Sequence, residues 1–237
     1  MKPIAYIYNN YTEKFGIPRQ SGLVGDSFSR IVFEPEYRNP DALRGLDGFS
    51  HIWLIWEFSE VVKNRKESLK EGHEWDEPKA SWSPTVRPPR LGGNERIGVF
   101  ASRSPFRPNP LGLSCVRLEE IIYEGVNAPV LRVSGADLMN GTPIFDIKPY
   151  IAYSDAHPEA LAGWTGEYGF PKVQVDFLPE VTGLLTEDEL LELKEMLQND
   201  PRPAYQRNRQ KEYRFKFAGK EISVSADKEI LTVTGIS

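Results

Sequence analysis

Short apolar segments rich in β-branched and aromatic residues recur along the first 180 residues, and glycine, proline, asparagine and aspartate lie between them. Such segments are typical of strands, and the residues between them favour turns. We predict strands at Ile4–Tyr8, Ile31–Phe33, Phe49–Phe58, Ile97–Phe100, Leu113–Ile122, Val130–Val133, Ile144–Ile151 and Val173–Phe177. This pattern predicts a mostly antiparallel β domain that forms a barrel or another closed sheet.

The end of the chain follows a different pattern. Thr186 precedes the segment EDELLELKEMLQN, in which acids fill the first turn and Leu190, Leu193 and Leu197 fall on one face. A threonine cap and early acids are typical of a helix start. The strand-like segments YRFKF, EISVS and ILTVT follow this helix. We therefore predict a mainly β protein with two domains: an antiparallel β-barrel over residues 1–180 and a small α+β domain over residues 181–237.

Composition excludes several classes of protein. The 237 residues, 40% of them hydrophobic, can supply a proper core. No stretch approaches roughly eighteen consecutive apolar residues, and the N-terminus lacks the pattern of a signal peptide, so we expect a cytoplasmic protein without a membrane span. The single Cys115 cannot form an internal disulfide and is expected in the core. The three histidines are too scattered for zinc ligands, so we expect no metal.

The common nucleotide-binding and nucleophile motifs are missing. Gly92, Gly93 and Gly98 have the wrong spacing for a dinucleotide-binding fingerprint, and no phosphate-binding P-loop occurs. Ser114 in GLSCV lacks the closing glycine of a nucleophile elbow. These absences exclude the Rossmann and P-loop interpretations.

Two basic segments stand out in a chain whose formal charge is −5. Residues 87–107 hold five arginines against the single acid Glu95, and residues 201–216 hold six cations against Glu212. Arginine suits bidentate recognition of phosphate or carboxylate, and proline and glycine fix the backbone of the first segment. Plain surface solvation is the alternative interpretation, above all for the second segment. From the residues alone, the chain is a β-rich protein with an arginine-lined site.

Four stretches, in order, resemble one known family: "FGIPRQ", "RGLDGFSHIWLIWEF", "TVRPPRLGGNERIGVFASRSPFRPNPLGLS" and "DLMNGTPIFDIKPYIAY". They are similar to the TsaA/TrmO-like (YaeB) family, whose signature matches Gly98–Asn109. "DPRPAY", residues 200–205, is similar to the hallmark of the family's bacterial C-terminal domain. The resemblance implies an antiparallel β-barrel enzyme that uses S-adenosylmethionine to methylate N6 of threonylcarbamoyl-adenosine (t6A) at tRNA position 37, giving m6t6A.

The resemblance also implies a cofactor site. Its expected residues are Pro18, Arg19, Gln20, Ser59, Glu60, Arg103, Leu113, Asp137, Leu138, Met139 and Asn140. At Ser59 and Glu60 the chain departs from the family, where many members have an acid or histidine followed by glutamine. The segment 61–82 is also longer than usual; it is either a lid over the site or a plain loop.

The reaction needs the N6 proton to leave the ureido nitrogen, and a carboxylate nearby would help. Asp146 is our candidate for this role, with Lys148 and Tyr150 as neighbours that orient it, because the three share one face of a strand. A structural Asp–Lys pair on the strand surface is the alternative.

The expected partner is the tRNA anticodon stem-loop. The candidate RNA contacts are Arg87, Arg90, Arg96, Arg107, Arg202 and Arg207, with Tyr205 as a stacking surface for an unpaired base. The resemblance and the apolar run Ile52–Phe58 predict a homodimer. Two other functions stay open: a non-catalytic RNA-binding module, and a methyltransferase that acts on a small molecule.

Overall fold

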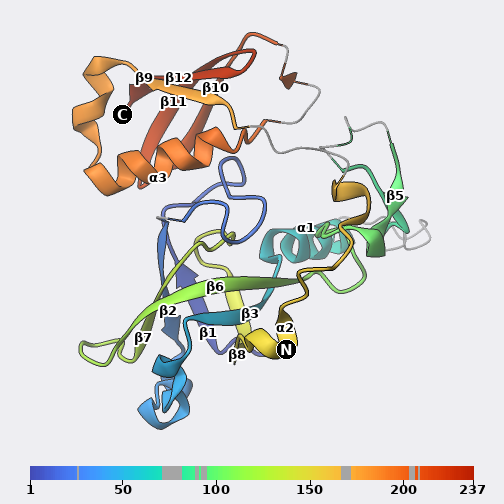
Figure 1. Ribbon diagram of the computed structural model, residues 1–237, viewed down its shortest axis with the longest axis vertical. Helices are drawn as coiled ribbons and strands as arrows, with labels where there is room; N and C mark the ends of the chain where they lie inside the picture. The colour runs from blue at the N-terminus through green and yellow to red at the C-terminus, as the bar shows by residue number, and fades with distance from the viewer. Residues whose placement is uncertain are drawn as a thin grey trace.

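The computed structural model describes residues 1–25, 27–70, 82–88, 91, 95–166, 172–202, 206–207 and 209–237. Figure 1 shows a barrel below and a second sheet with its helix above, the latter coloured orange to red. Within the described ranges, no helix is long and apolar enough to cross a membrane.

The barrel is closed and has the strand order β1-β2-β7-β6-β3-β8. Its strands are β1 (Ala5–Tyr8), β2 (Phe28–Phe33), β3 (His51–Glu57), β6 (Leu111–Ile122), β7 (Val130–Ser134) and β8 (Pro143–Pro149). Every neighbouring pair is antiparallel. The predicted antiparallel barrel is thereby confirmed, and closure leaves no free sheet edge.

Alternation along the strands decides which side chains fill the barrel. On β3, Ile52, Leu54 and Trp56 are buried, and the residues between them face outward. On β6 the inward positions begin with Gly112, Ser114 and Val116. Cys115 therefore lies on the outer face of β6 and is only partly buried. The prediction that Cys115 belongs to the core is wrong, because the strand alternates in the opposite phase.

Two shorter units extend from the barrel wall. Helix α1 (Ser59–Lys70) follows β3. Strands β4 (Thr85–Val86) and β5 (Ile97–Gly98) form a small antiparallel pair. Residues 71–81 of the predicted lid or loop lie outside the described residues. Other short helices are α2 (Ala152–Asp155) and 3-10 turns at Pro35–Tyr37, Pro40–Leu43, Leu46–Gly48, Val99–Ala101, Gly163–Gly166 and Pro179–Leu184.

The second sheet has the order β10-β11-β12-β9 and packs on helix α3. Its elements are β9 (Gln174–Phe177), α3 (Glu187–Gln198), β10 (Lys211–Phe217), β11 (Lys220–Asp227) and β12 (Ile230–Ile236). Thr186 and Glu189 form the capping box that starts α3, as the sequence predicts. The strand predicted at 173–177 lies in this sheet, parallel to β12, and not in the barrel, because Val173 and Val175 are buried in this core. The division into two domains stays a prediction.

The loop of residues 9–25, between β1 and β2, packs into the core of the second sheet. Tyr11 and Val24 are buried there, and Phe15 and Ile17 pack against the same cluster. Gly16 has φ +94°, and a Cβ on it would lie 2.8 Å from the Met196 sulfur, so only glycine fits. Figure 1 shows this dark blue loop rising from the barrel toward α3. The loop that holds the predicted Pro18–Gln20 turn is thus supported by the C-terminal core.

Candidate functional site

A hydrogen-bonded chain of side chains crosses the inside of the barrel to Asp137. Trp56 Nε1 donates to Ser114 Oγ at 2.9 Å, and Ser114 Oγ donates in turn to Asp137 Oδ1. A Cβ on Gly112 would lie 2.2 Å from the Trp56 ring, so glycine gives the indole the space it occupies. Strands β3 and β6 therefore fix the position of a carboxyl in the loop after β7.

The surroundings of Asp137 favour a polar ligand. Burial raises the pKa of Asp137, and the Ser114 hydrogen bond, backbone N–H groups at Asp137 and Ser21, and the Arg103 charge oppose this shift. A partly buried carboxyl that feels the charge of an arginine is an arrangement found at binding sites.

Arg103 connects two loops that are far apart in the sequence. Its Nη1 donates a short hydrogen bond to Gln20 Oε1, and its charge reaches Asp137. Three predicted cofactor residues, Gln20, Arg103 and Asp137, therefore lie together.

Arg19, the middle residue of the Pro18–Gln20 turn, points away from this group. Its Nη2 donates to the carbonyl oxygens of Asp200 at 3.2 Å and Arg202 at 2.8 Å. Pro18 is buried. The guanidinium of Arg19 thus connects the turn to the C-terminal part of the chain.

Arg202 is a structural residue, and its prediction as an RNA contact is wrong. Its side chain is 1% exposed, forms a 2.7 Å ion pair with Asp200, and donates to Lys228 O at 2.7 Å. A phosphate cannot reach a guanidinium that is buried and paired in this way. Arg207 pairs with the other Asp200 oxygen at 2.8 Å but stays 36% exposed.

The other predicted RNA contacts differ in solvent exposure and in the hydrogen bonds that they form within the protein. Arg87 and Arg96 are exposed, and Arg96 donates to Thr85 Oγ1 at 2.9 Å. Arg107 donates to Ser102 O at 3.1 Å inside its own loop, and its carbonyl accepts from Arg65 of α1 at 2.9 Å. Arg90 and Tyr205 lie outside the described residues.

The predicted catalytic residues lie on the outer surface of the barrel. Lys148 Nζ lies 3.1 Å from Asp146 Oδ2, while Asp146 Oδ1 accepts from the N–H of Ile147 at 2.9 Å. The Tyr150 ring lies 5.8 Å from that of Trp53. The ion pair confirms that Asp146 and Lys148 share a face.

Leu113 belongs to the same outer surface and is 57% exposed. Ile55 pairs with Leu113 on one side and with Asp146 on the other, so the three form a row across β6, β3 and β8. Ser59 and Glu60 open helix α1 beyond the end of β3. The structure thus divides the predicted residues between the Asp137 group and this outer row.

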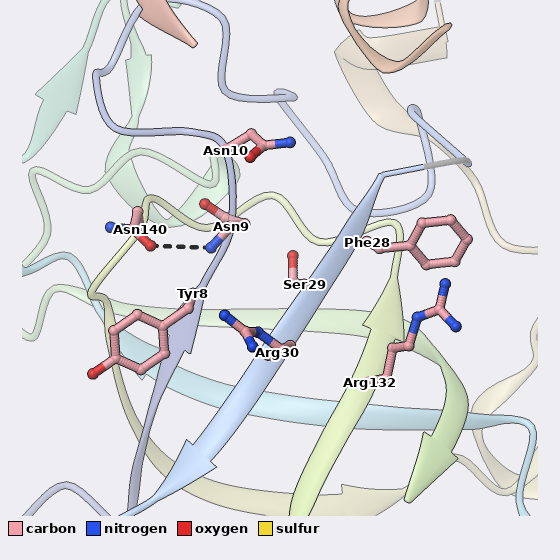
Figure 2. Close-up of a pocket in the computed structure, with 8 residues that line it drawn as sticks. All are labelled: Tyr8, Asn9, Asn10, Phe28, Ser29, Arg30, Arg132 and Asn140. Atoms are coloured by element: carbon pink, nitrogen blue, oxygen red, sulfur yellow. Dashed lines mark hydrogen bonds between the residues drawn. The ribbon is translucent and has the colours of Figure 1, made fainter. Parts of the chain in front are cut away.

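A pocket of about 450 Å³ opens on the outer face of β1, β2 and β7. It is lined by Tyr8, Asn9, Asn10, Phe28, Ser29, Arg30, Arg132 and Asn140 (Figure 2). Asn140 and its neighbours Leu138 and Met139 are predicted cofactor residues; the backbone N–H of Asn9 donates to Asn140 Oδ1 at 3.0 Å, and Asn9 Nδ2 donates to Leu138 O at 2.9 Å. Sequence reasoning missed Arg30 and Arg132. The available signal was a lone arginine in each of two apolar strands, FSRIVF and VLRVS.

The described residues contain no cluster of histidine, cysteine, aspartate and glutamate that could hold a metal ion. Sequence comparison is more decisive. The model of the tRNA-methyltransferase O N-terminal domain matches residues 6–156, and that of the TrmO C-terminal domain matches residues 171–237. The chain belongs to the TrmO family.

Curated relatives agree with this assignment. A tRNA (adenine(37)-N6)-methyltransferase of Escherichia coli K12 is 39% identical over 210 residues, which cover 86% of this chain and 82% of the relative. The enzyme of the same name from Eikenella corrodens is 39% identical over 189 residues, 79% of this chain and 97% of the relative. A Pseudomonas aeruginosa protein with the provisional name of S-adenosylmethionine-dependent methyltransferase is 38% identical over 214 residues, 87% of this chain and 83% of the relative.

A solved structure has the same fold. The crystal structure of TrmO from Pseudomonas aeruginosa superimposes with a TM-score of 0.72 at 28% identity, covering 99% of this chain and 94% of that chain. The TrmO fold therefore extends over both the barrel and the C-terminal sheet.

Proposed function

We propose that this protein is a tRNA methyltransferase that transfers a methyl group from S-adenosylmethionine to N6 of t6A at position 37, giving m6t6A. The observation that carries the proposal is the meeting of Gln20, Arg103 and Asp137, from three separate loops, in a chain of the TrmO family. Membership in the family supports N6 methylation of tRNA adenine. The t6A substrate rests on the resemblance described above.

The residues present fit S-adenosylmethionine. Asp137 suits the amino group or the ribose hydroxyls, and Arg103 suits the carboxylate. Pro18, Gln20 and the 138–140 loop supply backbone groups around them, and Leu113, Ser59 and Glu60 remain proposed contacts. No helix N-terminus is needed, because the molecule has no phosphate.

When bound, the cofactor supplies an activated methyl group on a sulfonium. The protein's part is positioning, which in favourable cases lowers a barrier by roughly 7–11 kcal/mol. Arg103 is held by Gln20, and Asp137 is held by Ser114, so both groups are oriented before binding.

Removal of the N6 proton is assigned to Asp146. One of its oxygens is paired with Lys148 and the other accepts a backbone N–H, so the carboxylate is oriented, and it is half exposed to solvent. Tyr150 flanks this face through its contact with Trp53. In this proposal Asp146 accepts the proton and Lys148 holds the carboxylate in place.

Arg87, Arg96 and Arg207 are proposed as phosphate contacts because their side chains reach solvent. The protein is proposed to act in the cytoplasm as a homodimer.

The experiment is mass spectrometry of nucleosides from tRNA incubated with the protein and methyl-labelled S-adenosylmethionine. One tRNA sample carries t6A, and a matched sample lacks the threonylcarbamoyl group. Label in m6t6A from the first sample alone supports the full proposal. Label in N6-methyladenosine from the second sample contradicts the t6A requirement, and no label in either nucleoside contradicts the proposed function.

A further inference from the structure

The pocket on β1, β2 and β7 contains two arginines opposite one another. Arg30 of β2 and Arg132 of β7 are direct cross-strand partners, and both point to the outer face (Figure 2). Like charges in this position destabilise a sheet unless an anion lies between them. Within the described residues neither arginine is in an ion pair, including with Glu120, the cross-strand partner of Arg132 on β6. The pair therefore has the form of an anion site that lacks its counter-charge.

Among the residues that the structure describes, the lining of the pocket contains no acid. Its members are the two arginines, three asparagines, one serine and two aromatic residues. This is unusual on a chain with a formal charge of −5. A locally positive pocket on a net acidic protein favours an anionic ligand.

The aromatic residues narrow the class of ligand. Tyr8 is 44% exposed and is the cross-strand partner of Arg30, while Phe28 is 38% exposed and lies under the Arg132 guanidinium, 4.3 Å from ring centre to guanidinium carbon. Phe28 thus holds Arg132 in place, and Tyr8 offers an open ring face beside Arg30. Phosphate-binding arginine next to an open aromatic ring is the combination by which proteins bind single-stranded RNA.

The pocket is also joined to the proposed cofactor site. Asn9 holds the loop of residues 138–140 through two hydrogen bonds, and Asp137 lies at the start of the same loop. In Figure 1, β2 and β7 lie on the side of the barrel away from β5, so this surface is separate from Arg87 and Arg96.

We propose that this pocket binds an unpaired nucleotide of the tRNA substrate, with Arg30 and Arg132 on its phosphate and Tyr8 against its base. The inference rests on the proposed function and adds a contact surface on the barrel itself. In this proposal the loop of residues 138–140 contacts the cofactor on one side and the RNA on the other.

The test measures binding of end-labelled tRNA to the full-length protein by fluorescence anisotropy over a series of KCl concentrations. Arg30→Gln and Arg132→Gln should each weaken binding roughly tenfold or more. Each should also lower the slope of log Kd against log salt by about 0.7–0.9, the value for one lost phosphate contact. Tyr8→Ala should weaken binding by roughly tenfold without changing that slope.

Matched controls separate this surface from general charge. Arg44→Gln removes an exposed arginine on the same barrel, outside the pocket, and should leave affinity and slope unchanged. Arg30→Lys and Arg132→Lys keep the positive charge and should keep the wild-type slope. These variants can still be measured if a glutamine variant folds poorly. Calorimetry with S-adenosylmethionine should give the wild-type affinity for all these variants.

Two results would overturn the proposal. The first is that the wild-type protein methylates tRNA and the Arg30→Gln, Arg132→Gln double variant binds tRNA with the same affinity and the same salt slope as the wild type. The second is a double variant that keeps tRNA affinity but changes the oligomeric mass in light scattering, since the arginines would then contact a second copy. Failure of the wild type itself to bind or methylate tRNA counts instead against the proposed function.

Discussion

The guanidinium of Arg19 is bonded to the backbone of the turn that contains Asp200 and Arg202, with Nη2 donating to both carbonyl oxygens. Arg19 lies in the loop between the first two barrel strands, whereas the carbonyls belong to the segment after α3. The proposed cofactor turn is therefore held from the C-terminal part of the chain, and the side chain of Arg19 is used in this contact.

Asp200→Asn tests this support. Asp200 has φ +48°, which asparagine tolerates, so the backbone should persist while Arg202 loses its buried counter-charge. We expect a loss of about 3–5 kcal/mol in the free energy of unfolding, as for other broken buried pairs, and weaker S-adenosylmethionine binding. Urea denaturation and calorimetry measure the two effects. Glu36→Gln, which breaks the exposed Lys2–Glu36 pair, should leave the free energy of unfolding almost unchanged. Equal stability of the two variants would contradict the role of Asp200.

Arg103→Ala tests the proposed carboxylate contact of the cofactor. It removes a charged donor from an exposed position, so the barrel should stay folded. S-adenosylmethionine binding should weaken by about 1.5–3 kcal/mol, the range for a hydrogen bond to a charged group. Arg96→Ala, on the neighbouring β4–β5 unit, is the control and should bind the cofactor normally. Unchanged affinity of Arg103→Ala in calorimetry would instead assign Arg103 to RNA binding or to the loop structure.

Glu192 gives a prediction about pH. Its side chain is 4% exposed in α3, and Oε2 accepts from Asn10 Nδ2 at 2.9 Å. Burial raises the pKa of Glu192, and the Glu189 charge adds to this rise, while the hydrogen bond from Asn10 opposes it. A carboxyl whose pKa is higher in the folded state binds more protons there, so its contribution to stability falls as pH rises above the unfolded pKa. Glu192→Gln should therefore flatten the decline of stability with pH. Parallel wild-type and mutant curves in urea denaturation at several pH values would contradict this.

Asp146→Asn separates proton removal from structure. If the carboxylate accepts the N6 proton, single-turnover methyl transfer should fall by roughly two to four orders of magnitude, with cofactor and tRNA affinities unchanged. Lys148→Gln removes the ion-pair partner and serves as the comparison. A variant with the wild-type rate but a lower Tm would show that the Asp146–Lys148 pair is only structural.

The oligomeric state is a separate prediction. We expect a homodimer, since the outer surface of β3, β6 and β8 presents Trp53, Ile55 and the 57% exposed Leu113 together. Light scattering at micromolar concentration should give twice the chain mass of 26.9 kDa. Trp53→Glu should shift the mass toward the monomer. A wild-type protein that is already monomeric would exclude the dimer.

Much of the fold could be predicted because the signals are local. Apolar segments rich in β-branched and aromatic residues marked most strands, and the threonine cap with early acids marked α3. Cys115 shows the limit of this reasoning. On β6 the small residue Gly112 and the polar residue Ser114 face inward because the Trp56 side chain fills the adjacent space. The apolar Cys115, between these inward positions and Val116, therefore faces outward, and the apolar residues of this strand do not mark its inner face.

The site was harder to predict because its contacts are non-local. Gln20, Arg103 and Asp137 came from family resemblance, and only the fold shows that they lie together. In the sequence, Arg202 is one of six cations in a segment that we interpreted as solvated. In the structure, Asp200 has a left-handed backbone, and the side chains of Asp200 and Arg202 form an ion pair in the interior. Arg30 and Arg132 are separated by a hundred residues of sequence, and only the β2–β7 register pairs them.

The parallel pairing of β9 with β12 also affects how the chain folds during synthesis. Strand β9 is made well before β12, yet it has no other strand partner in the described part of the chain. Tyr11, Val24 and Phe15 depend on the same core for burial. While the chain is still on the ribosome, the barrel strands can pair, but the 9–25 loop must wait until residues 230–236 have emerged. A premature stop codon just before β12 would therefore leave a barrel whose proposed cofactor turn has lost the core that orders it.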